Sequence, residues 1–219
     1  MWLPEDYIIK CSQEVDLNKF AGIDCYVGVD LAATSDLTAV AYLVVQDGTY
    51  YFKTHYYLPE SALKDKADKE LYKYWKQQSY LTVTSGNVTD YDYITTDMLR
   101  YADVVNIQSV GYDKYNATQW AIDSTEQGLP LEEYPQTLGN FNMPTRELER
   151  LILSGKAVID NNEINRYCFR NVTLKSDYNG NVKPNKAVDK KKIDGTIAMI
   201  QALGMYLRTP HYTNEILTI

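Results

Sequence analysis

Three aspartates stand where one expected element of the chain ends or another begins. Asp30 and Asp113 each follow a short run of apolar β-forming residues, and Asp194 opens an apolar segment with helical spacing. A carboxylate beside a folded core is costly to desolvate unless something pairs with it. Mg²⁺ prefers oxygen ligands, and two such ions, roughly 3.5–4 Å apart, can hold the attacking and leaving oxygens of a phosphodiester. The pattern therefore points to metal-dependent phosphodiester cleavage.

Each of these aspartates also has an ordinary structural interpretation. Asp194 could cap a helix, and Asp113 could form a turn. Asp36, in the small-residue turn that follows Asp30, could form an Asx-turn. Taken singly, these structural roles are the commoner ones, and the shared placement at element ends is what favours a metal site.

The elements expected to position these residues alternate between strands and helices. In chain order, strands are predicted over 25–33, 38–46, 49–57, 80–84, 107–112 and 131–135, and helices over 60–78, 90–105, 116–127 and 144–154. Residues 157–192 read as strands and turns with a hairpin tip at 179–181, and a last helix is expected over 194–207. This order predicts a mixed central α/β sheet with helices on both faces and a β-hairpin appendage. In such sheets, chemistry collects at strand ends.

Composition bounds the class of protein. The 219 residues, 45% of them hydrophobic, can bury one good core. The net charge of −7 is unusual for a protein that binds duplex DNA alone, so DNA binding would need metal, a local basic patch or another domain. No apolar run reaches membrane-spanning length, and three widely spaced cysteines argue against a zinc site. A soluble, intracellular protein without a membrane partner is expected.

Several short motifs follow one another in a characteristic order along the chain. They are Gly28–Ala39, Tyr56–Pro59, Tyr72–Lys76, Val110–Ala117, Gly128–Pro130, Asn171–Val172, Asp177–Asn181 and Lys192–Ala198. By the order and spacing of these motifs, more than by any one of them, the chain resembles a known family, the C-terminal nuclease domain of the large terminase subunit of tailed bacteriophages.

The resemblance implies a fold, an activity and a set of site residues. The fold would be RNase H-like, and the activity would be endonucleolytic cleavage of concatemeric viral DNA during genome packaging, with two Mg²⁺ or Mn²⁺ ions. Asp30, Asp113 and Asp194 match the three metal-binding acidic positions of the family, and Asp36 matches an acidic residue near the site. The implied partners are double-stranded DNA, the terminase ATPase domain, the small terminase subunit and the portal protein, in the cytoplasm of the bacterial host.

Two departures from the family bear on this interpretation. Members carry an N-terminal packaging ATPase, whereas this chain has no GxxxxGK[ST] motif, so we expect 1–24 to be a lead-in from that domain, 25–208 the nuclease domain and 209–219 a tail. Family members often have a histidine after the helix that corresponds to 144–154, where this chain has Asp160-Asn-Asn. We expect that change to affect the fold or DNA contacts and not the chemistry.

A lysine-rich segment lies just before the last expected helix. It could be a solvated hairpin, or it could contact DNA phosphates beside the site and offset the acidic surface. The five lysines are Lys183, Lys186, Lys190, Lys191 and Lys192.

Two competing functions stay open. The first is an RNase H-like module that binds DNA or a portal protein without cutting, which the loss of an acidic residue would favour. The second is an actin-like sugar kinase or ATPase, whose phosphate motif wants a glycine where Ala32 stands and whose fold needs two duplicated halves. With His55 and His211 as its histidines, the chain gives little support to a histidine-metal nuclease or a Ser-His-Asp hydrolase.

Overall fold

The computed structural model describes residues 2–32, 36–65, 68–115, 117–188 and 191–210. Over these residues, eight strands form one mixed sheet in the order β1-β8-β4-β3-β2-β6-β7, with β5 beside β4. The strands are β1 (Ser12–Gln13), β2 (Asp24–Asp30), β3 (Thr38–Gln46), β4 (Thr49–Pro59), β5 (Thr82–Thr84), β6 (Asn106–Tyr112), β7 (Leu131–Glu133) and β8 (Ala157–Asp160). A separate hairpin is made by β9 (Val172–Ser176) and β10 (Val182–Lys186).

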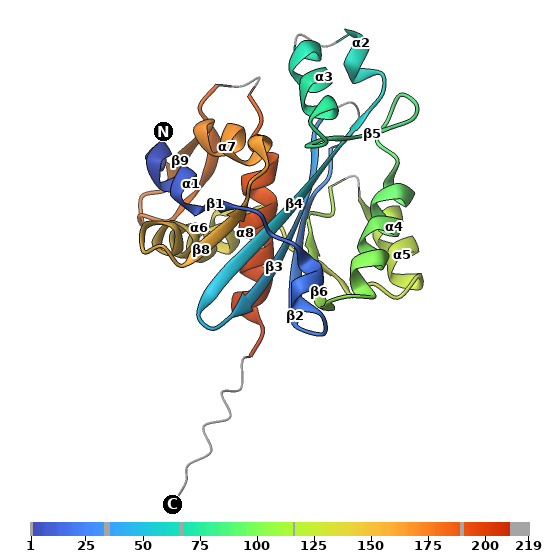
Figure 1. Ribbon diagram of the computed structural model, residues 1–219. Helices are drawn as coiled ribbons and strands as arrows, with labels where there is room; N and C mark the ends of the chain where they lie inside the picture. Colours follow the sequence, from blue (N-terminus) through green and yellow to red (C-terminus); the bar gives the residue numbers. More distant parts are fainter. Residues whose placement is uncertain (1, 33–35, 66–67, 116, 189–190, 211–219) are drawn as a thin grey trace, which may run out of the picture.

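Helices cover both faces of the sheet (Figure 1). They are α1 (Glu5–Cys11), the 3₁₀ turn η1 (Leu17–Phe20), α2 (Ala62–Asp65), α3 (Lys69–Gln77), α4 (Tyr91–Ala102), α5 (Thr118–Glu126), α6 (Leu138–Leu153), α7 (Glu163–Arg170) and α8 (Asp194–Arg208). Helices α4 and α5 lie on one side of the sheet, and α1, α6, α7 and α8 lie on the other. The expected mixed sheet with helices on both faces and a hairpin appendage is confirmed.

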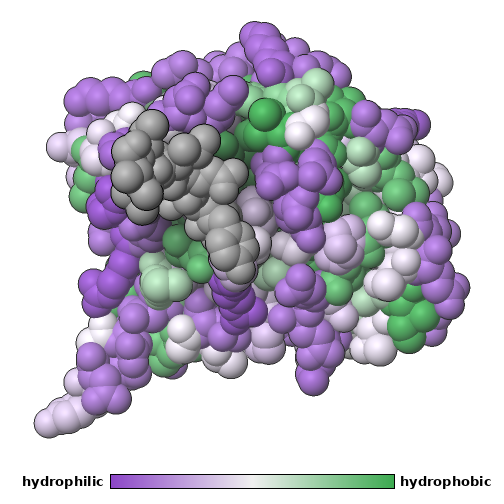
Figure 2. Space-filling model, turned by 90° about the horizontal axis from the view of Figure 1, so that it is seen from below, coloured by the Kyte–Doolittle hydropathy of each residue, from purple (hydrophilic) through white to green (hydrophobic). Residues whose placement is uncertain are grey.

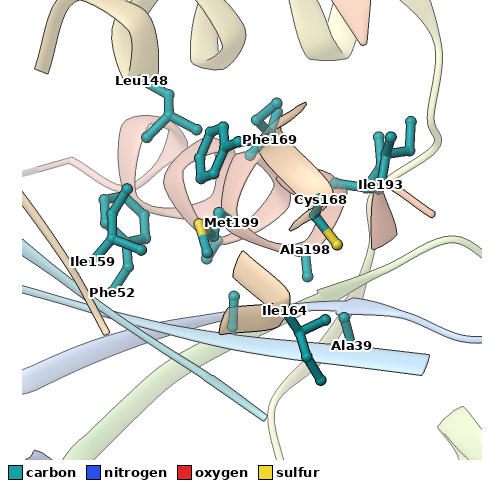
Figure 3. Packing of buried hydrophobic residues seen from close by; sticks show 14 of the residues in the cluster. Ala39, Phe52, Leu148, Ile159, Ile164, Cys168, Phe169, Ile193, Ala198 and Met199 are labelled. Carbon is teal, nitrogen blue, oxygen red and sulfur yellow. The ribbon is translucent and has the colours of Figure 1, made fainter. Parts of the chain in front are cut away.

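The alternation of side chains along β3 shows how the sheet separates two apolar cores. Ala39, Ala41 and Leu43 belong to the core beneath α8, while Val40, Tyr42 and Val44 belong to the core beneath α4 and α5. Successive strand residues point to opposite faces, so a strand buried on both sides reads as a continuous apolar run. Figure 3 shows part of the α8 core, where side chains of α6, α7 and α8 meet the sheet.

The central helix α8 lies unusually close to β2. A Cβ atom built on Gly28 would lie 2.1 Å from the Ala198 carbonyl oxygen and 2.4 Å from the Ala202 nitrogen. No larger residue fits there without moving the helix or the strand. The glycine therefore sets the separation of β2, which ends at Asp30, from α8, which begins at Asp194.

The β9–β10 hairpin is fixed to helix α6 near its tip. The Val182 N–H donates to Asn142 Oδ1 at 2.9 Å, and Arg146 Nη2 donates to the Gly180 carbonyl oxygen at 2.6 Å. The expected hairpin tip at 179–181 is confirmed. The side chains of Asn142 and Arg146 hold this tip against helix α6.

Three sequence expectations differ from the structure. The segment expected to hold only strands and turns contains helix α7, which Asn162 caps by accepting a hydrogen bond from the Ile164 N–H. Helix α6 begins at Leu138, six residues before the expected start, because Thr137 caps it and Pro144 lies inside it. The helix expected over 60–78 is described as two shorter ones, α2 and α3.

The expected lead-in is itself packed against the domain. Helix α1 contributes Ile8 and Cys11 to the α8 core, β1 pairs with β8, and η1 adds Leu17 and Phe20 to the opposite core. The domain limits at 24/25 and 208/209 stay predictions.

All three cysteines are buried free thiols. Among the described helices, none is long and apolar enough to cross a membrane. The face of the molecule seen in Figure 2 mixes hydrophilic and hydrophobic side chains.

Candidate active site

Asp30 and Asp113 lie at the carboxyl ends of two neighbouring strands. Strands β2 and β6 are parallel neighbours, and their pairing runs to Val29 opposite Tyr112. Asp30 follows Val29 as the last residue of β2, and Asp113 follows Tyr112 directly after β6. Because the carboxyl ends of parallel neighbours meet at one edge of the sheet, the expectation that these two carboxylates belong together agrees with the register.

Gln136 joins these two aspartates, although no sequence motif marks it as a site residue. Its side-chain Nε2 donates to Asp30 Oδ1 at 2.9 Å, and its backbone N–H donates to Asp113 Oδ2, also at 2.9 Å. Gln136 lies two residues beyond Tyr134, whose N–H donates to the Tyr112 carbonyl oxygen at 2.6 Å and so continues the pairing of β6 with β7. A lone glutamine between a short strand and a helix cap carries no motif.

Asp194 lies in the first turn of α8, where the helix dipole favours a negative charge. It is not the N-cap: that position is Ile193, and no side chain caps the helix. The Asp194 Oδ2 atom is buried and has no hydrogen-bond partner among the described residues. A buried, unpartnered carboxylate oxygen is costly, and a bound cation would satisfy it.

A cavity of about 510 Å³ connects Asp194 with Asp30. Asp36, Gln136 and Lys186 also line it. A second cavity, of about 220 Å³, is also lined by Asp30, together with Leu31, Asp113, Tyr115 and Gln136. Asp30 therefore faces both cavities and is the carboxylate that they share.

The surroundings of Asp30 and Asp194 oppose the ionised form of both residues. Burial, followed by the charge of Asp194, raises the pKa of Asp30 to about 8 from its ordinary 3.8. Burial, followed by the charge of Asp36, raises the pKa of Asp194 to about 6. Desolvation and like-charge repulsion are both relieved when a cation binds between the carboxylates.

Asp113 is held by the backbone on both of its oxygens. In addition to the Gln136 contact, its Oδ1 accepts from the Tyr115 N–H at 3.0 Å, so Asp113 also fills the turn-forming role considered above. In the described parts of the chain, no three acidic, histidine or cysteine side chains converge closely enough to form a complete metal cage. Instead, Asp30 lines one cavity together with Asp194 and a second cavity together with Asp113.

Asp36 is paired with a lysine, although it lines the larger cavity. Lys192 Nζ forms an ion pair with Asp36 Oδ1, and the Leu37 N–H donates to the same oxygen at 3.0 Å. Burial alone would raise the pKa of Asp36, but the hydrogen bond and charge of Lys192 outweigh it and lower the pKa. The bond from the adjacent Leu37 N–H is not the bond from the second residue onward that defines an Asx-turn, so the Asx-turn considered for Asp36 is not observed.

The lysine segment divides into residues with different contacts. Lys183 Nζ donates to the Gln136 carbonyl oxygen at 3.0 Å, Lys192 pairs with Asp36, and Lys191 lies 5.7 Å from the centre of the Tyr167 ring. Lys186 lines the larger cavity and makes no ion pair with a described residue, but its charge acts on Asp30 and Asp194. Lys190 lies outside the described residues.

The donor set suits a hard divalent cation. All candidate ligands are carboxylate oxygens, and a carboxylate offers about four lone-pair positions, so the hydrogen bonds described above leave Asp30 and Asp113 with free acceptor capacity. Asp30 with Asp113 would hold one cation and Asp30 with Asp194 a second. Among the candidate ligand atoms, the Oδ2 atom of Asp194 has the clearest need of a cation, because it has no hydrogen-bond partner among the described residues.

Known proteins resemble this chain in sequence and in fold. The family described as "Terminase large subunit, endonuclease domain" matches residues 1–209. "Protein YmfN" of Escherichia coli (strain K12) is 31% identical over 210 residues, which are 88% of this chain and 45% of that protein. The crystal structure of the HK97 bacteriophage large terminase superposes with a TM-score of 0.82 at 25% identity, covering 92% of this chain and 43% of the terminase chain.

A more distant structure shows the same fold. The large terminase nuclease of thermophilic phage G20c with bound magnesium has a TM-score of 0.56 at 12% identity, covering 83% of this chain and 80% of that one. Terminase nuclease domains are RNase H-like, and the expected fold class is thereby confirmed. The chain spans less than half the length of the E. coli and HK97 proteins.

The match over nearly the whole chain, the agreement in fold and the acidic site at the ends of β2 and β6 lead to one conclusion. This chain belongs to the family of terminase large subunit endonuclease domains.

Proposed function

We propose that this domain is a divalent-metal-dependent endonuclease that cuts concatemeric viral DNA during genome packaging. The observation that carries the proposal is the placement of Asp30 between two cavities, with Asp113 lining one and Asp194 the other. A carboxylate shared by two adjacent cation positions is what two-ion phosphodiester hydrolysis requires. Mg²⁺ or Mn²⁺ is the cofactor.

The protein side chains have distinct tasks in this proposal. Asp30 would hold both ions, Asp113 the first and Asp194 the second. When bound, the ions supply a water activated for attack and a neutralising charge at the leaving 3′ oxygen. Lys186, whose charge already acts on the acidic pair, is placed to contact the phosphate of the DNA strand.

A related nuclease supports the choice of cofactor. The G20c terminase nuclease has been crystallised with magnesium and also with cobalt. These structures share the fold of this chain, and the oxygen-only ligand set described above suits the same class of cation.

The partners follow from the family and extend beyond this domain. We propose that the domain acts in one chain with a packaging ATPase, on double-stranded DNA, together with a small terminase subunit and a portal protein, in the bacterial cytoplasm. Its net charge of −7 makes independent binding to DNA weak, so another part of the motor would hold the duplex.

Plasmid cleavage tests the proposed activity. Purified protein with Mn²⁺ or Mg²⁺ should nick and linearise supercoiled plasmid, and EDTA should stop the reaction. Strong cutting in EDTA would contradict the role of metal, and DNA binding without cutting in any divalent metal would favour the non-cleaving module instead. Asp30 and Asp113 end neighbouring strands and Asp194 lines a cavity with Asp30, so all three acidic residues are present, which favours the nuclease over that module.

A further inference from the structure

The contacts of Gln136 go beyond filling space beside the acidic residues. One residue supplies a side-chain donor to Asp30 and a backbone donor to Asp113, both at 2.9 Å. It also lines both cavities at which the cations would bind. We propose that Gln136 is a positioning residue, which sets the spacing and orientation of Asp30 and Asp113 for metal binding; this inference rests on the proposed function.

The physical reason is that these carboxylates do not hold themselves in place. When both are ionised, as metal binding requires, they carry like charges at neighbouring strand ends, and each side chain has two rotatable bonds. Charge-assisted hydrogen bonds from N–H donors are stronger than neutral ones and fix the acceptor oxygen. Each bond occupies one of about four lone-pair positions, so it orients the carboxylate and leaves the other positions for a cation.

Two neighbours fix Gln136 in turn. Thr137 begins the cap of α6 by accepting a hydrogen bond from the Asn140 N–H at 3.3 Å, so Gln136 directly precedes a rigid helix. On the other side, Lys183 Nζ of β10 donates to the Gln136 carbonyl oxygen at 3.0 Å. Lys183 is half-buried, and the hairpin that carries it is fixed to α6 by Asn142. The hairpin thus supports the acidic pair through Gln136.

This arrangement gives Lys183 a different task from the other lysines of its segment. Its ammonium group donates a hydrogen bond to the backbone carbonyl of Gln136, beside the candidate site. We therefore assign Lys183 to the support of Gln136, and the two residues should act as a unit.

Calorimetric titration with Mn²⁺ in the absence of DNA tests the proposal. The proteins are the wild type, Gln136→Ala, Gln136→Asn, Lys183→Ala and the double variant Gln136→Ala/Lys183→Ala. Alanine at 136 keeps the backbone N–H that binds Asp113 and removes only the amide that orients Asp30. Gln108→Ala is the matched control, because Gln108 Nε2 donates to Asp24 Oδ1 at 3.0 Å on an exposed part of the same sheet.

The expected result is a loss of Mn²⁺ affinity without a matching loss of thermal stability. Gln136→Ala should bind Mn²⁺ about tenfold more weakly, as is common when an outer partner of a metal ligand is removed. Gln136→Asn, whose amide is one methylene short, should also be weaker than wild type. Lys183→Ala should have a smaller effect, and the double variant should lose less affinity than the two single losses combined, since both residues support the same acidic pair through position 136. The melting temperature in EDTA should change no more than in Gln108→Ala.

Two different failures are distinguishable. If the wild type binds Mn²⁺ and both Gln136 variants bind it equally well, the positioning role is wrong and the proposed function stands. If the wild type itself does not bind Mn²⁺, the proposed function fails. Additive effects of the two substitutions would show that Lys183 does not act through Gln136.

Discussion

Lys192 forms an ion pair with Asp36, a residue 156 positions earlier in the chain. The pair joins the segment just before α8 to the segment just before β3, at the rim of the cavity that Asp30 and Asp194 share. Its lysine is largely buried, with 13% of the side chain exposed, so the charge of Asp36 is neutralised within the protein. Among the described contacts, Asp36 has a lysine partner, whereas Asp30, Asp113 and Asp194 form no ion pair with a described residue.

This ion pair predicts a modest effect of Asp36→Asn. Because Lys192 already holds the carboxylate, the variant should keep cleavage within about tenfold of wild type, which is about 1.4 kcal/mol in activation free energy. Single-turnover cleavage of a labelled duplex with saturating Mn²⁺ measures this. A loss as deep as that of Asp30→Asn would place Asp36 among the metal ligands.

Replacement of the three central aspartates should abolish cleavage. Asp30→Asn, Asp113→Asn and Asp194→Asn each remove a charge needed to hold the ions, and we expect a loss of at least about a thousandfold, or about 4 kcal/mol. Asp103→Asn, at the exposed end of α4, is the charge-matched control. Wild-type cleavage by any of the three would remove that residue from the site.

The stability of the metal-free protein should fall as pH rises. The pKa values of Asp30 and Asp194 are raised to about 8 and about 6, against 3.8 for an ordinary aspartate. Between about pH 4 and pH 8 the folded state therefore binds more protons than the unfolded state, and this favourable contribution is lost as pH rises through that range. Thermal melts in EDTA across this range should show a steeper fall for wild type than for Asp30→Asn. Equal slopes would contradict the raised pKa of Asp30.

The lysines should differ in their effect on DNA binding. Lys186→Ala should lower the slope of log affinity against log salt by about one unit, because one phosphate contact is lost. Lys10→Ala removes an exposed lysine from α1 and should leave the slope unchanged. Filter binding with Ca²⁺ in place of Mg²⁺ measures both, and the wild-type affinity should itself be weak. Identical slopes for the two variants would show that Lys186 is only a solvated residue of the hairpin.

A methyl group at Gly28 should disturb the site from a distance. The added Cβ would meet backbone atoms of α8, and overpacking of this kind costs about 1–3 kcal/mol or more. Gly28→Ala should therefore lower the free energy of unfolding and weaken Mn²⁺ binding by shifting Asp194 away from Asp30. Gly139→Ala, where a Cβ meets nothing within 4 Å, is the matched control. Urea unfolding and Mn²⁺ titration of both variants check this, and equal behaviour of the two would contradict the close approach of α8.

The parts of the fold that were predictable have strong local signals. The meander from β2 to β4 follows from continuous apolar runs and the Asp47-Gly48 turn, and α8 follows from its helical spacing. Helix α7 was missed because it is only eight residues long and its cap is a single asparagine. The start of helix α6 was predicted too late because proline is typical of a helix start, whereas Pro144 lies in the second turn of this helix.

The candidate site was predictable only in its charged members. Asp30 and Asp113 lie at the ends of apolar strands and could be paired by the rule for parallel neighbours, and Asp194 is the first residue of a largely apolar helix. Gln136 could not be found in this way, because its role depends on the pairing of β6 with β7 and on a backbone donor that every residue type except proline possesses. The separate tasks of Lys183 and Lys192 likewise depend on tertiary contacts.

The direction of α8 has a practical consequence for handling the protein. The helix starts at the acidic site and runs for 15 residues, about 22 Å at 1.5 Å per residue, before the chain leaves it (Figure 1). An affinity tag, fluorophore or surface anchor attached after Arg208 would therefore be separated from the candidate site by the length of the helix. Immobilisation through that end should leave the candidate site open to long DNA, which suits single-molecule measurements of the proposed cleavage.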